Sequence, residues 1–404
     1  MTPAARVQAA IDLLDAIIIA ARDGGAAADV QIVRYFKTRR YAGSKDRRAV
    51  RDLVYDAIRR TAERPDNGRA AMVGLARERD DLAALFDGSA HGPAPLDPAE
   101  AGSDAAAVPR WIAPLLAAPV EQDALLGRAP LDLRVNRLRA DMVRARQSLP
   151  DAEPLAGLPD ALRLPEGAPI EQSAAWIEGL VEVQDAGSQI ISNACEVAPG
   201  MKVIDMCAGA GGKTLALAAA MGGQGRLIAA DTARDRIARL APRAERSGAA
   251  GIETLLLDQG REANALAPLS GVADVVLVDA PCSGTGTWRR NPEGRWRLTP
   301  ARLDRLVAEQ ARILDFAAPL VAPGGRLVYA VCALTDREGR DQVAAFLARH
   351  QGWSAMSTAS EVDQQGVQAE GFGRHWGHGI LLTPAHDGTD GFFFAVLSAP
   401  VQAN

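Results

Sequence analysis

The sequence has no long hydrophobic run, few cysteines and no internal repeat, and these absences exclude several classes of protein. The longest apolar run near its start, residues 16–21, is far shorter than the roughly 20 residues that a helix needs to span a bilayer. Asp12, Asp15 and Arg22 flank this run without the layout of a signal peptide. We therefore expect a cytoplasmic protein with no membrane partner.

Cysteine is too scarce and too dispersed for a metal centre or a disulfide framework. The four cysteines show no CxxC spacing, which argues against a zinc site, and a reducing compartment argues against disulfides. Each thiol is therefore structural or catalytic on its own. The cysteines are Cys195, Cys207, Cys282 and Cys332.

Positive charge is unevenly spread along this slightly acidic chain, whose formal net charge is −5. Basic residues gather in three segments, residues 34–64, 134–146 and 289–297. One such run is most often a solvated helix face. Three of them in an otherwise acidic chain favour a phosphate-rich partner.

The opening part of the chain is predicted to be helical. Apolar residues recur there at helical spacing, a Gly-, Pro- and Ser-rich linker follows at 88–107, and two short helices close the part. The predicted helices are residues 7–21, 49–62, 72–86, 111–116 and 120–126. Next, two alternating segments, 131–135 and 179–184, and a helix at 141–149 predict a small mixed module.

After Ser188 the sequence alternates short apolar strands with helices, as in a parallel sheet covered on both faces. The strands are predicted near residues 203–204, 227–230, 255–257, 275–278 and 326–330, with helices such as 215–221, 234–247 and 303–318 between them. Each strand ends at a polar or reactive residue, and these residues should converge on one crevice because parallel strands share their carboxyl edge. They are Asp205, Asp231, Asp258, Asp279 and Cys332. Any single Asp there is equally consistent with a helix cap.

The loop after the first of these strands contains Gly209, Gly211 and Gly212. Glycine permits positive φ and lets a ligand lie against backbone amides. A strand, glycine loop and helix are about equally consistent with a nucleotide-like cofactor and with packing alone. Asp231, about twenty residues further on, lies where an acid can accept hydrogen bonds from a ribose.

Two of the thiols differ from the others in their predicted position. Cys282 and Cys332 each follow an apolar strand at the crevice, where loop or helix amides can lower the pKa of a thiol. Cys195 lies inside a helical pattern, which indicates a small buried hydrophobe. Trp288 and Trp296, near the third basic segment, are equally consistent with stacking on bases and with burial.

Several motifs in the same order resemble those of one protein family. They are DMCAGAGGKT (205–214), DAPCSGTG (279–286) followed by RRNPEGRW (289–296), VYAVC (328–332) and DGFFFAVL (390–397). Together they resemble the Sun/RsmB family of S-adenosylmethionine-dependent RNA (cytosine-5) methyltransferases. VQDAGSQ (183–189) and PLDLRVNRL (130–138) are similar to segments that precede the catalytic domain in that family, and DRRAVRDLVYDAIRR (46–60) resembles its NusB-like domain.

The resemblance implies an α/β fold in three domains. A Rossmann-like methyltransferase domain at 187–400 would follow a small α/β module at 128–186 and an all-helical, NusB-like RNA-binding domain at 1–127. It also implies catalytic roles. Cys332 matches the nucleophile that adds to C6 of cytosine, Cys282 the cysteine that assists product release, Asp279 the acid on the target base, and Lys213 a lysine facing the pocket. As an alternative, Lys213 is a solvated residue at a helix start, although a cation there opposes the helix dipole.

The implied cofactor is S-adenosylmethionine, whose positive charge suits a site rimmed by Asp. The residues implied to bind it are Cys207, Ala208, Gly209, Ala210, Gly211, Gly212, Lys213, Asp231, Asp258 and Asp279. The chain departs from the family where the usual Ala-Ala-Pro-Gly is Ala-Gly-Ala-Gly at 208–211 and where Val331 replaces a Thr. The usual adenine-side acid aligns with Asp258 or, one residue later, with Gln259.

The implied substrate is single-stranded or loop RNA, because a base must leave its stack for C5 to be reached. The NusB-like opening favours small-subunit ribosomal RNA, and we expect a monomer. Three alternatives remain open at this stage. They are methylation of transfer RNA, an RNA-binding assembly factor that has lost catalysis, and an amino-group methyltransferase, which would need no thiolate.

Overall fold

A computed structural model of the protein describes residues 1–165, 167–356 and 371–401. The chain packs into two compact units, which are described separately. The first comprises Met1–Leu116, Glu121–Gly127 and Thr287–Arg302, and the second comprises Ala117–Val120, Arg128–Gly286 and Leu303–Asn404. No helix in the described ranges combines the length and apolar character that crossing a membrane requires. The residues 357–370, inside the predicted third domain, lie outside the described residues. The three predicted domain boundaries stay a prediction.

The first unit is helical, and its longest helix begins and ends at residues suited to those positions. Pro3 opens α1 after the Thr2 side chain, which accepts a hydrogen bond from the amide of Ala5, and Gly24 closes it with φ 74°. The helices of this unit are α1 (Pro3–Asp23), α2 (Ala28–Lys37), α3 (Ser44–Arg60), α4 (Gly68–Ala76), α5 (Asp80–Ala83), η1 (Ala113–Leu115), η2 (Gln122–Leu126) and α13 (Gly294–Arg297).

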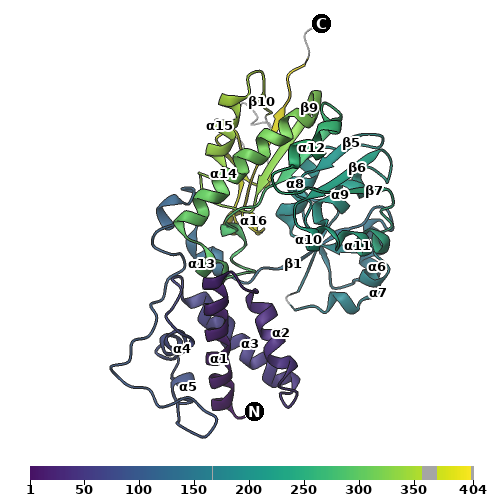
Figure 1. Ribbon diagram of the computed structural model, residues 1–404. Coiled ribbons are helices and arrows are strands. Elements are labelled where there is room, and N and C mark those ends of the chain that lie inside the picture. The colour runs from purple at the N-terminus through teal and green to yellow at the C-terminus, as the bar shows by residue number, and fades with distance from the viewer. Residues whose placement is uncertain (166, 357–370, 402–404) are drawn as a thin grey trace, which may run out of the picture. The chain divides into compact units, whose positions relative to one another are not determined.

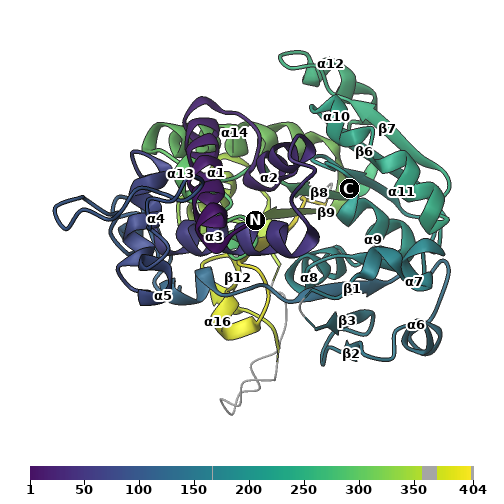
Figure 2. The same cartoon turned by 90° about the horizontal axis from the view of Figure 1, so that it is seen from below.

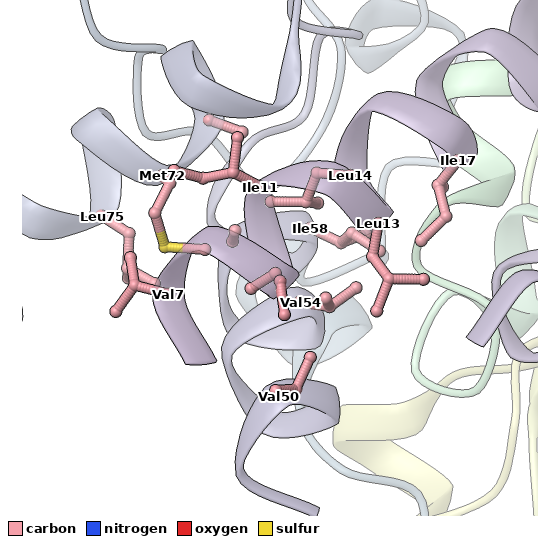
Figure 3. Close-up of a cluster of buried hydrophobic side chains, with 14 of the residues drawn as sticks. Val7, Ile11, Leu13, Leu14, Ile17, Val50, Val54, Ile58, Met72 and Leu75 are labelled. Carbon is pink, nitrogen blue, oxygen red and sulfur yellow. The ribbon is translucent and has the colours of Figure 1, made fainter. Parts of the chain in front are cut away.

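The core of the helical unit lies between α1, α3 and α4. Figure 3 shows the apolar side chains that these three helices contribute, spaced three or four residues apart along each helix. Helix α13, although distant in sequence, adds Trp296 to the same core. Burial of this continuous apolar face is the main source of stability for such helices.

The second unit contains a small antiparallel sheet of four strands in the order β2-β3-β1-β4. These are β1 (Leu131–Val135), β2 (Glu153–Pro154), β3 (Ala161–Leu164) and β4 (Val181–Val183), accompanied by α6 (Met142–Ser148), η3 (Ile170–Gln172) and α7 (Ala174–Ile177). Figure 2 shows β1, β3 and β2 side by side. Alternate residues of β1 face a separate small core, which explains the alternating pattern seen in the sequence.

The described residues of the second unit also form a nine-stranded sheet in the order β11-β12-β13-β9-β8-β5-β6-β7, with β10 paired to β13. Its strands are β5 (Lys202–Asp205), β6 (Arg226–Asp231), β7 (Ile252–Leu256), β8 (Ala273–Asp279), β9 (Val321–Val331), β10 (Ser354–Ala355), β11 (Arg374–Trp376), β12 (Gly379–Leu382) and β13 (Phe392–Ser398). The five strands from β9 to β7 are parallel, and β10 to β13 pair antiparallel. Figure 1 shows β9, β5, β6 and β7 in this one sheet.

Helices connect the strands of the large sheet in the manner of a doubly wound fold. They are α8 (Ala186–Ala194), α9 (Gly212–Ala220), α10 (Arg234–Ile237), α11 (Leu240–Ser247), α12 (Glu262–Leu266), η4 (Ala267–Leu269), η5 (Thr285–Thr287), α14 (Pro300–Ala317), η6 (Ala318–Leu320), α15 (Arg340–Arg349) and α16 (Pro384–Asp387). The predicted fold class is confirmed: a mixed α/β chain with a Rossmann-like sheet and a helical N-terminal region.

Some element boundaries differ from the sequence prediction. The predicted helix 234–247 is two helices, α10 and α11, because Pro242 has no N–H to donate to the carbonyl four residues earlier and therefore lies in the first turn of a new helix. The predicted helix 72–86 is likewise two shorter helices, α4 and α5. Strand β3, inside a segment punctuated by Pro and Gly, and helix α2 were not predicted.

Candidate functional site

The chain reverses its direction of travel across the large sheet at β5. From β5 it continues outward through β6 to β7, and it then returns to place β8 and β9 on the other side of β5. Such a switch point opens a crevice beyond the carboxyl ends of the strands. Asp205, Asp231 and Asp279 are the last residues of β5, β6 and β8, and Cys332 directly follows β9. The structure therefore places these four predicted site residues along one edge.

The glycine loop between β5 and α9 needs two of its glycines for its backbone conformation. Gly209 has φ 56° and Gly211 has φ 87°, and a Cβ on Gly211 would lie 2.2 Å from Cδ1 of Leu240. Gly212 has no such restriction, because a Cβ there would meet no atom within 4 Å. The third glycine thus leaves space beside the loop where a ligand can approach the backbone.

Asp231 fastens this loop from the neighbouring strand. Its Oδ2 accepts a hydrogen bond from the amide of Gly209 at 2.7 Å, and its Oδ1 accepts one from the amide of Ala233, also at 2.7 Å. The carboxylate is buried, and each oxygen keeps a second lone pair. The helix-cap and ligand-contact roles considered for this residue are therefore compatible.

Asp205 lies beneath the loop and is almost completely buried. Burial raises the pKa of Asp205 to about 7, although its Oδ2 accepts a hydrogen bond from Thr214 Oγ1 at 2.7 Å. Its Oδ1 has no partner that meets full hydrogen-bond geometry among the described residues, although the nearby amide of Cys207 acts to lower its pKa. A buried acid with an unsatisfied oxygen indicates a site that is completed by a cationic or hydrogen-donating ligand.

Lys213 and Asp279 form an ion pair across the crevice, with Nζ 2.6 Å from Oδ2. Burial alone would lower the pKa of Lys213, but the charge of Asp279 and the hydrogen bond to it outweigh burial and raise that pKa. Cys332 and Asp205 act in the same direction from nearby. Lys213 is therefore a protonated, buried cation, which excludes the solvated role considered for it.

Cys282 and Cys332 are neighbours, with 3.2 Å between their sulfur atoms, and both are free thiols. The contact with Cys332, followed by burial, raises the pKa of Cys282 well above its usual range. Cys282 therefore keeps its proton near neutral pH. Two sequence-predicted residues that are 50 positions apart thus form one pair at the carboxyl ends of β8 and β9.

The fully buried Glu338 joins the two cysteine loops, and the sequence did not single it out. Its carboxylate accepts hydrogen bonds from the amide and hydroxyl of Ser283 at 2.7 and 2.5 Å and from Thr335 Oγ1 at 2.8 Å. Gln310 Nε2 of α14 donates a fourth at 3.1 Å. Because Glu338 stands in the polar run TDREGR, its composition indicated a solvated residue, and no local signal marked it as buried.

The two remaining thiols do not belong to this pair. Cys195 is completely buried in the core around the sheet, as its helical pattern predicted. Cys207 lies in the glycine loop, where burial and then the charges of Asp205, Asp279 and Asp231 raise its pKa well above the usual range. Cys207 is therefore neutral, and its proximity to three acids places it beside the predicted cofactor crevice.

Asp258 is a predicted site residue for which the structure shows no side-chain contact among the described residues. It follows β7 by two residues and is exposed, as is Gln259. Only its backbone carbonyl, which accepts a hydrogen bond from the amide of Arg261 at 2.9 Å, makes a contact that the structure records. The choice between Asp258 and Gln259 for the adenine side stays a prediction.

The third basic segment is not a solvated face. Trp296 belongs to the helical core and its Nε1 donates to the carbonyl of Thr61 at 2.8 Å, and Trp288 is equally buried. Arg295 is 1 % exposed and donates to the carbonyl of Ala107 at 2.7 Å, and burial lowers its pKa to about 10. Of the two roles considered for Trp288 and Trp296, the structure therefore supports burial and not stacking on bases.

Together these features define a Rossmann-like methyltransferase. The crevice holds three carboxylates, Asp205, Asp231 and Asp279, and a glycine loop with open space beside Gly212. S-adenosylmethionine carries no phosphate, so its site needs no cluster of cations. Its positively charged sulfonium and ammonium groups are attracted by these acids.

Comparison with known proteins gives the family. The family described as 16S rRNA methyltransferase RsmB/F matches residues 194–398, which is about half of the chain. The chain belongs to this RsmB/F family, as the motifs predicted, and the cofactor of the family is S-adenosylmethionine. A ribosomal RNA small subunit methyltransferase B from Xanthomonas campestris pv. campestris is 34% identical over 274 residues, covering 67% of this chain and 60% of that protein. The aligned part spans about three fifths of the length of the curated relatives that it matches.

Solved structures support the fold. A protein named PH0851 aligns with a TM-score of 0.73 at 22% identity, covering 98% of this chain and 99% of the other. A methyltransferase homolog protein from Pyrococcus horikoshii aligns with a TM-score of 0.59 at 22% identity, covering 69% and 89% of the two chains. At this level of identity the likeness concerns the fold alone.

Proposed function

We propose that this protein transfers a methyl group from S-adenosylmethionine to C5 of a cytosine in RNA, through a covalent bond between Cys332 and C6 of the base. We further propose small-subunit ribosomal RNA as the substrate. Membership of the RsmB/F family and the name of the Xanthomonas relative support a ribosomal substrate. The pair of thiols at the crevice supports the covalent route.

The observation that carries this proposal is the 3.2 Å contact between the sulfur atoms of Cys282 and Cys332. Transfer to an exocyclic amino group starts from a nucleophilic nitrogen and has no use for a thiol. C5 of cytosine is a poor nucleophile, so it must first be activated by addition at C6. A pair of thiols beside the cofactor crevice serves this second chemistry.

The two thiols divide the work through their protonation. Because the pKa of Cys282 is raised, we assign the proton between the two sulfur atoms to Cys282 and the attack on the base to Cys332. The Cys332 sulfur forms a bond to C6, and the electron pair of the C5–C6 double bond moves toward N3 and the carbonyl of the ring. C5 then takes the methyl group, and the S–CH3 bond of the sulfonium would break to leave a neutral thioether. Loss of the C5 proton to a base and cleavage of the S–C6 bond restore the aromatic ring and the thiol.

Asp279 and Lys213 supply the polar contacts for this addition. The Lys213–Asp279 pair would hold a proton at the N3 edge, and this proton stabilises the negative charge that develops on the ring when the thiolate adds. The charge of Asp279 and the hydrogen bond to it offset the cost of burying the Lys213 ammonium, which in turn keeps that carboxylate oriented at 2.6 Å. Cys282 donates a proton to the departing Cys332 sulfur and so assists release of the methylated RNA.

The glycine loop and its acids would hold the cofactor, which supplies an electrophilic methyl group on a sulfonium. The amides from Cys207 to Gly212 and the carboxylate of Asp231 line the predicted binding side of the crevice. Asp205 lies beneath the loop, and a bound cation would favour its charged form against the effect of burial, which raises its pKa. These acids attract a cation and repel the phosphates of a nucleotide.

RNA would also bind the helical unit, which we propose is the NusB-like domain. A cavity of about 470 Å³ lies between α2 and α3, with Ile32, Val33 and Phe36 as its apolar part. Val33 is 68 % exposed, although it is a large hydrophobic residue. Four cations complete the lining, namely Lys37, Arg47, Arg48 and Arg51. Apolar surface beside basic side chains suits single-stranded nucleic acid, whose bases stack while its phosphates pair with the cations.

The decisive experiment measures transfer of tritiated methyl groups from S-adenosylmethionine to 16S ribosomal RNA and to transfer RNA, with the wild type and with Cys332→Ala. We expect the wild type to label ribosomal RNA at C5 of cytosine and Cys332→Ala to label neither RNA. Cys195→Ala is the matched control, since it removes a thiol from the core without touching the site, and it should retain transfer.

Each alternative gives a different result in the same experiment. Activity that persists in Cys332→Ala would contradict the covalent mechanism and favour methylation of an amino group. Labelling of transfer RNA alone would overturn the proposed substrate. Binding of RNA by a wild type that transfers no methyl group would identify an assembly factor without catalysis.

A further inference from the structure

The predicted cofactor loop is rich in glycine and contains no proline, so its own sequence does little to fix its conformation. Three of the residues from Cys207 to Lys213 are glycines, the residues that lose the most backbone freedom on folding. Hydrogen bonds from two backbone amides anchor the loop to the sheet. The amide of Ala208 donates to the carbonyl of Ala230 at 3.0 Å, and the amide of Gly209 donates to the carboxylate of Asp231. Ala210 follows these two anchored residues in the chain, so its backbone needs a separate contact to be fixed.

Among the described residues, one side chain forms a hydrogen bond to the backbone of Ala210. Arg243 of α11 donates from Nη1 to the carbonyl of Ala210 at 2.8 Å. An arginine is long and loses much rotamer freedom when it is fixed, so this contact orders the loop only if the guanidinium is itself held in place.

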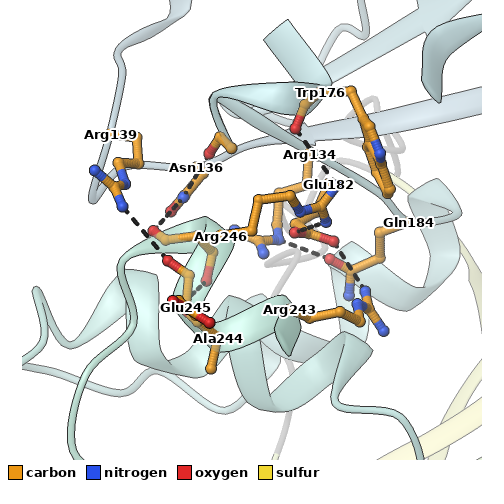
Figure 4. A network of polar contacts seen from close by, with 12 residues as sticks. Arg134, Asn136, Arg139, Trp176, Glu182, Gln184, Arg243, Ala244, Glu245 and Arg246 are labelled. Carbon is orange, nitrogen blue, oxygen red and sulfur yellow. Dashed lines mark hydrogen bonds and ion pairs between the residues drawn. The ribbon is translucent and has the colours of Figure 1, made fainter. Parts of the chain in front are cut away.

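Glu182 of the small sheet holds that guanidinium. Its carboxylate is 1 % exposed and accepts a hydrogen bond from Arg243 Nη2 at 2.9 Å, while its other oxygen accepts from Arg246. Figure 4 shows the Glu182 carboxylate with dashed lines to Arg243 and Arg246. A buried carboxylate with two charge-assisted hydrogen bonds is a rigid anchor.

The surrounding residues keep this anchor in place. Arg134 donates from Nε to Gln184 at 2.7 Å on the strand side, and the guanidinium of Arg246 stacks 3.5 Å above the ring of Trp176. Asn136 ties the end of α11 to the small sheet by donating to the carbonyl of Ser247 at 2.8 Å. Hydrogen bonds therefore join the small sheet to α11, and within this network Arg243 bonds both to Glu182 and to Ala210.

We infer that Arg243 is a positioning residue for the cofactor loop, and that Glu182 of the small module fixes it in that role. Rather than touching the ligand, Arg243 holds the Ala210 carbonyl so that the amides of the loop keep the conformation that binds S-adenosylmethionine. This inference rests on the proposed function, since it assigns the loop to that cofactor. It also gives the small antiparallel module a task in the methyltransferase site.

Arg246 provides a matched control within the same network. It binds the same carboxylate from the same helix, but its other contacts are with Trp176 and not with the loop. Arg243→Met and Arg246→Met each remove one guanidinium while keeping an unbranched stem. A purely structural role predicts similar effects of the two variants, whereas the positioning role predicts different ones.

The experiment measures binding of S-adenosylhomocysteine by calorimetry and hydrogen exchange of the peptide that covers the loop, without RNA. We expect Arg243→Met to weaken binding about tenfold, because one charge-assisted hydrogen bond is lost. The same variant should speed amide hydrogen exchange of the loop in the free protein. Arg246→Met should stay within about twofold of wild type in affinity and leave loop exchange unchanged. Glu182→Gln, which keeps the shape of the anchor, should weaken binding more than Arg246→Met.

Equal affinities for Arg243→Met and wild type, or equal losses in both arginine variants, would overturn the inference. Failure of the wild type to bind S-adenosylhomocysteine would instead contradict the proposed function. In that case the exchange measurement alone tests whether Arg243 positions the loop. Faster loop exchange confined to Arg243→Met would support this role, and unchanged exchange would refute it.

Discussion

The two sides of the crevice are built on different physical principles. On the cofactor side, beyond β5 and β6, the polar groups are carboxylates that bind backbone amides of a glycine loop, as Asp231 does. On the thiol side, beyond β8 and β9, the sulfur atoms of Cys282 and Cys332 touch each other and the Asp279 carboxylate is paired with Lys213. The buried carboxylate of Glu338 accepts four hydrogen bonds there and takes no part in binding the glycine loop.

This difference indicates what each side must do. Fixed negative charge attracts and retains a cationic cofactor, which the protein binds without reacting with it. A thiol nucleophile must form and break a bond in every turnover, so its neighbours have to control its proton rather than its position alone. Damage to the thiol side should therefore change the chemistry, whereas damage to the cofactor side should change affinity. The predictions below test this contrast.

Cys282→Ala should have the largest effect that sharpens the contrast. Without the thiol that returns a proton to Cys332, the S–C6 bond should persist, and a covalent complex of protein and RNA should accumulate that survives denaturing electrophoresis. Multiple turnover should fall by more than about 100-fold, in the range expected for loss of an acid–base group. Affinity for S-adenosylhomocysteine should stay unchanged.

The double variant Cys282→Ala, Cys332→Ala is the control for that experiment, since it cannot form the bond to C6. A covalent complex in the double variant, or rapid turnover of Cys282→Ala without any complex, would contradict the division of labour between the two thiols.

Glu338→Ala should have the next largest effect, because it leaves four donors of the thiol side without their acceptor. Each buried donor without a partner costs about 1–3 kcal/mol, so the free energy of unfolding should fall by several kcal/mol. The maximal rate of methyl transfer should fall, while binding of S-adenosylhomocysteine should change little where the protein remains folded.

Glu338→Gln keeps the shape and part of the acceptor capacity, so it should recover some of the stability and rate. Glu309→Ala, which removes a partly exposed glutamate from α14, is the matched control and should alter neither. A Glu338→Gln variant that loses cofactor affinity instead of rate would break the contrast between the two sides.

Asp231→Asn should have a smaller effect, confined to affinity. An amide can accept only on its oxygen, so one of the amides of Gly209 and Ala233 loses its acceptor, and the negative charge is lost as well. We expect about tenfold weaker binding of S-adenosylhomocysteine and a raised KM for the cofactor, with a maximal rate near that of wild type. Asp235→Asn, on the exposed start of α10, is the control. A lowered maximal rate at saturating cofactor would contradict this prediction.

The contrast also explains what the sequence could predict. Asp205, Asp231, Asp279 and Cys332 lie at or directly after strand ends, so a parallel sheet brings them to one edge without knowledge of the side-chain packing. Lys213 and the division of roles between Cys282 and Cys332 came from the family motifs, which the position of a residue in a sheet does not give.

The remaining parts depend on tertiary packing that has no local signature. Glu338 and Arg243 stand in polar, charged segments that are typical of a solvent-exposed face, yet one is buried and the other ties two elements together. Trp296 and Arg295 follow a catalytic motif in the sequence but pack in the helical unit, because the chain leaves the α/β unit at Thr287 and re-enters it at Leu303. The hydrophobic periodicity and the composition of a sequence segment indicate neither the burial of a single charged side chain nor the unit in which the segment packs.

Asp205 gives the most specific prediction, which concerns the dependence of stability on pH. Its pKa is raised in the folded protein to about 7, from an ordinary value of 3.8, because burial disfavours the charged form. The stability that this group contributes is therefore fully present below pH 4 and is lost as the pH rises through 7. At about 1.4 kcal/mol per pKa unit the loss is on the order of 4 kcal/mol.

Asp205→Asn removes the titrating group and should flatten this dependence. In urea unfolding between pH 5 and pH 8, followed by a probe in the α/β unit, the variant should gain stability relative to wild type as the pH rises, whatever its offset at pH 5. Asp235→Asn, at an exposed position, should run parallel to wild type throughout. A constant difference between Asp205→Asn and wild type across this range would show that Asp205 is already charged in the free protein, so that no ligand cation is needed to stabilise its charge.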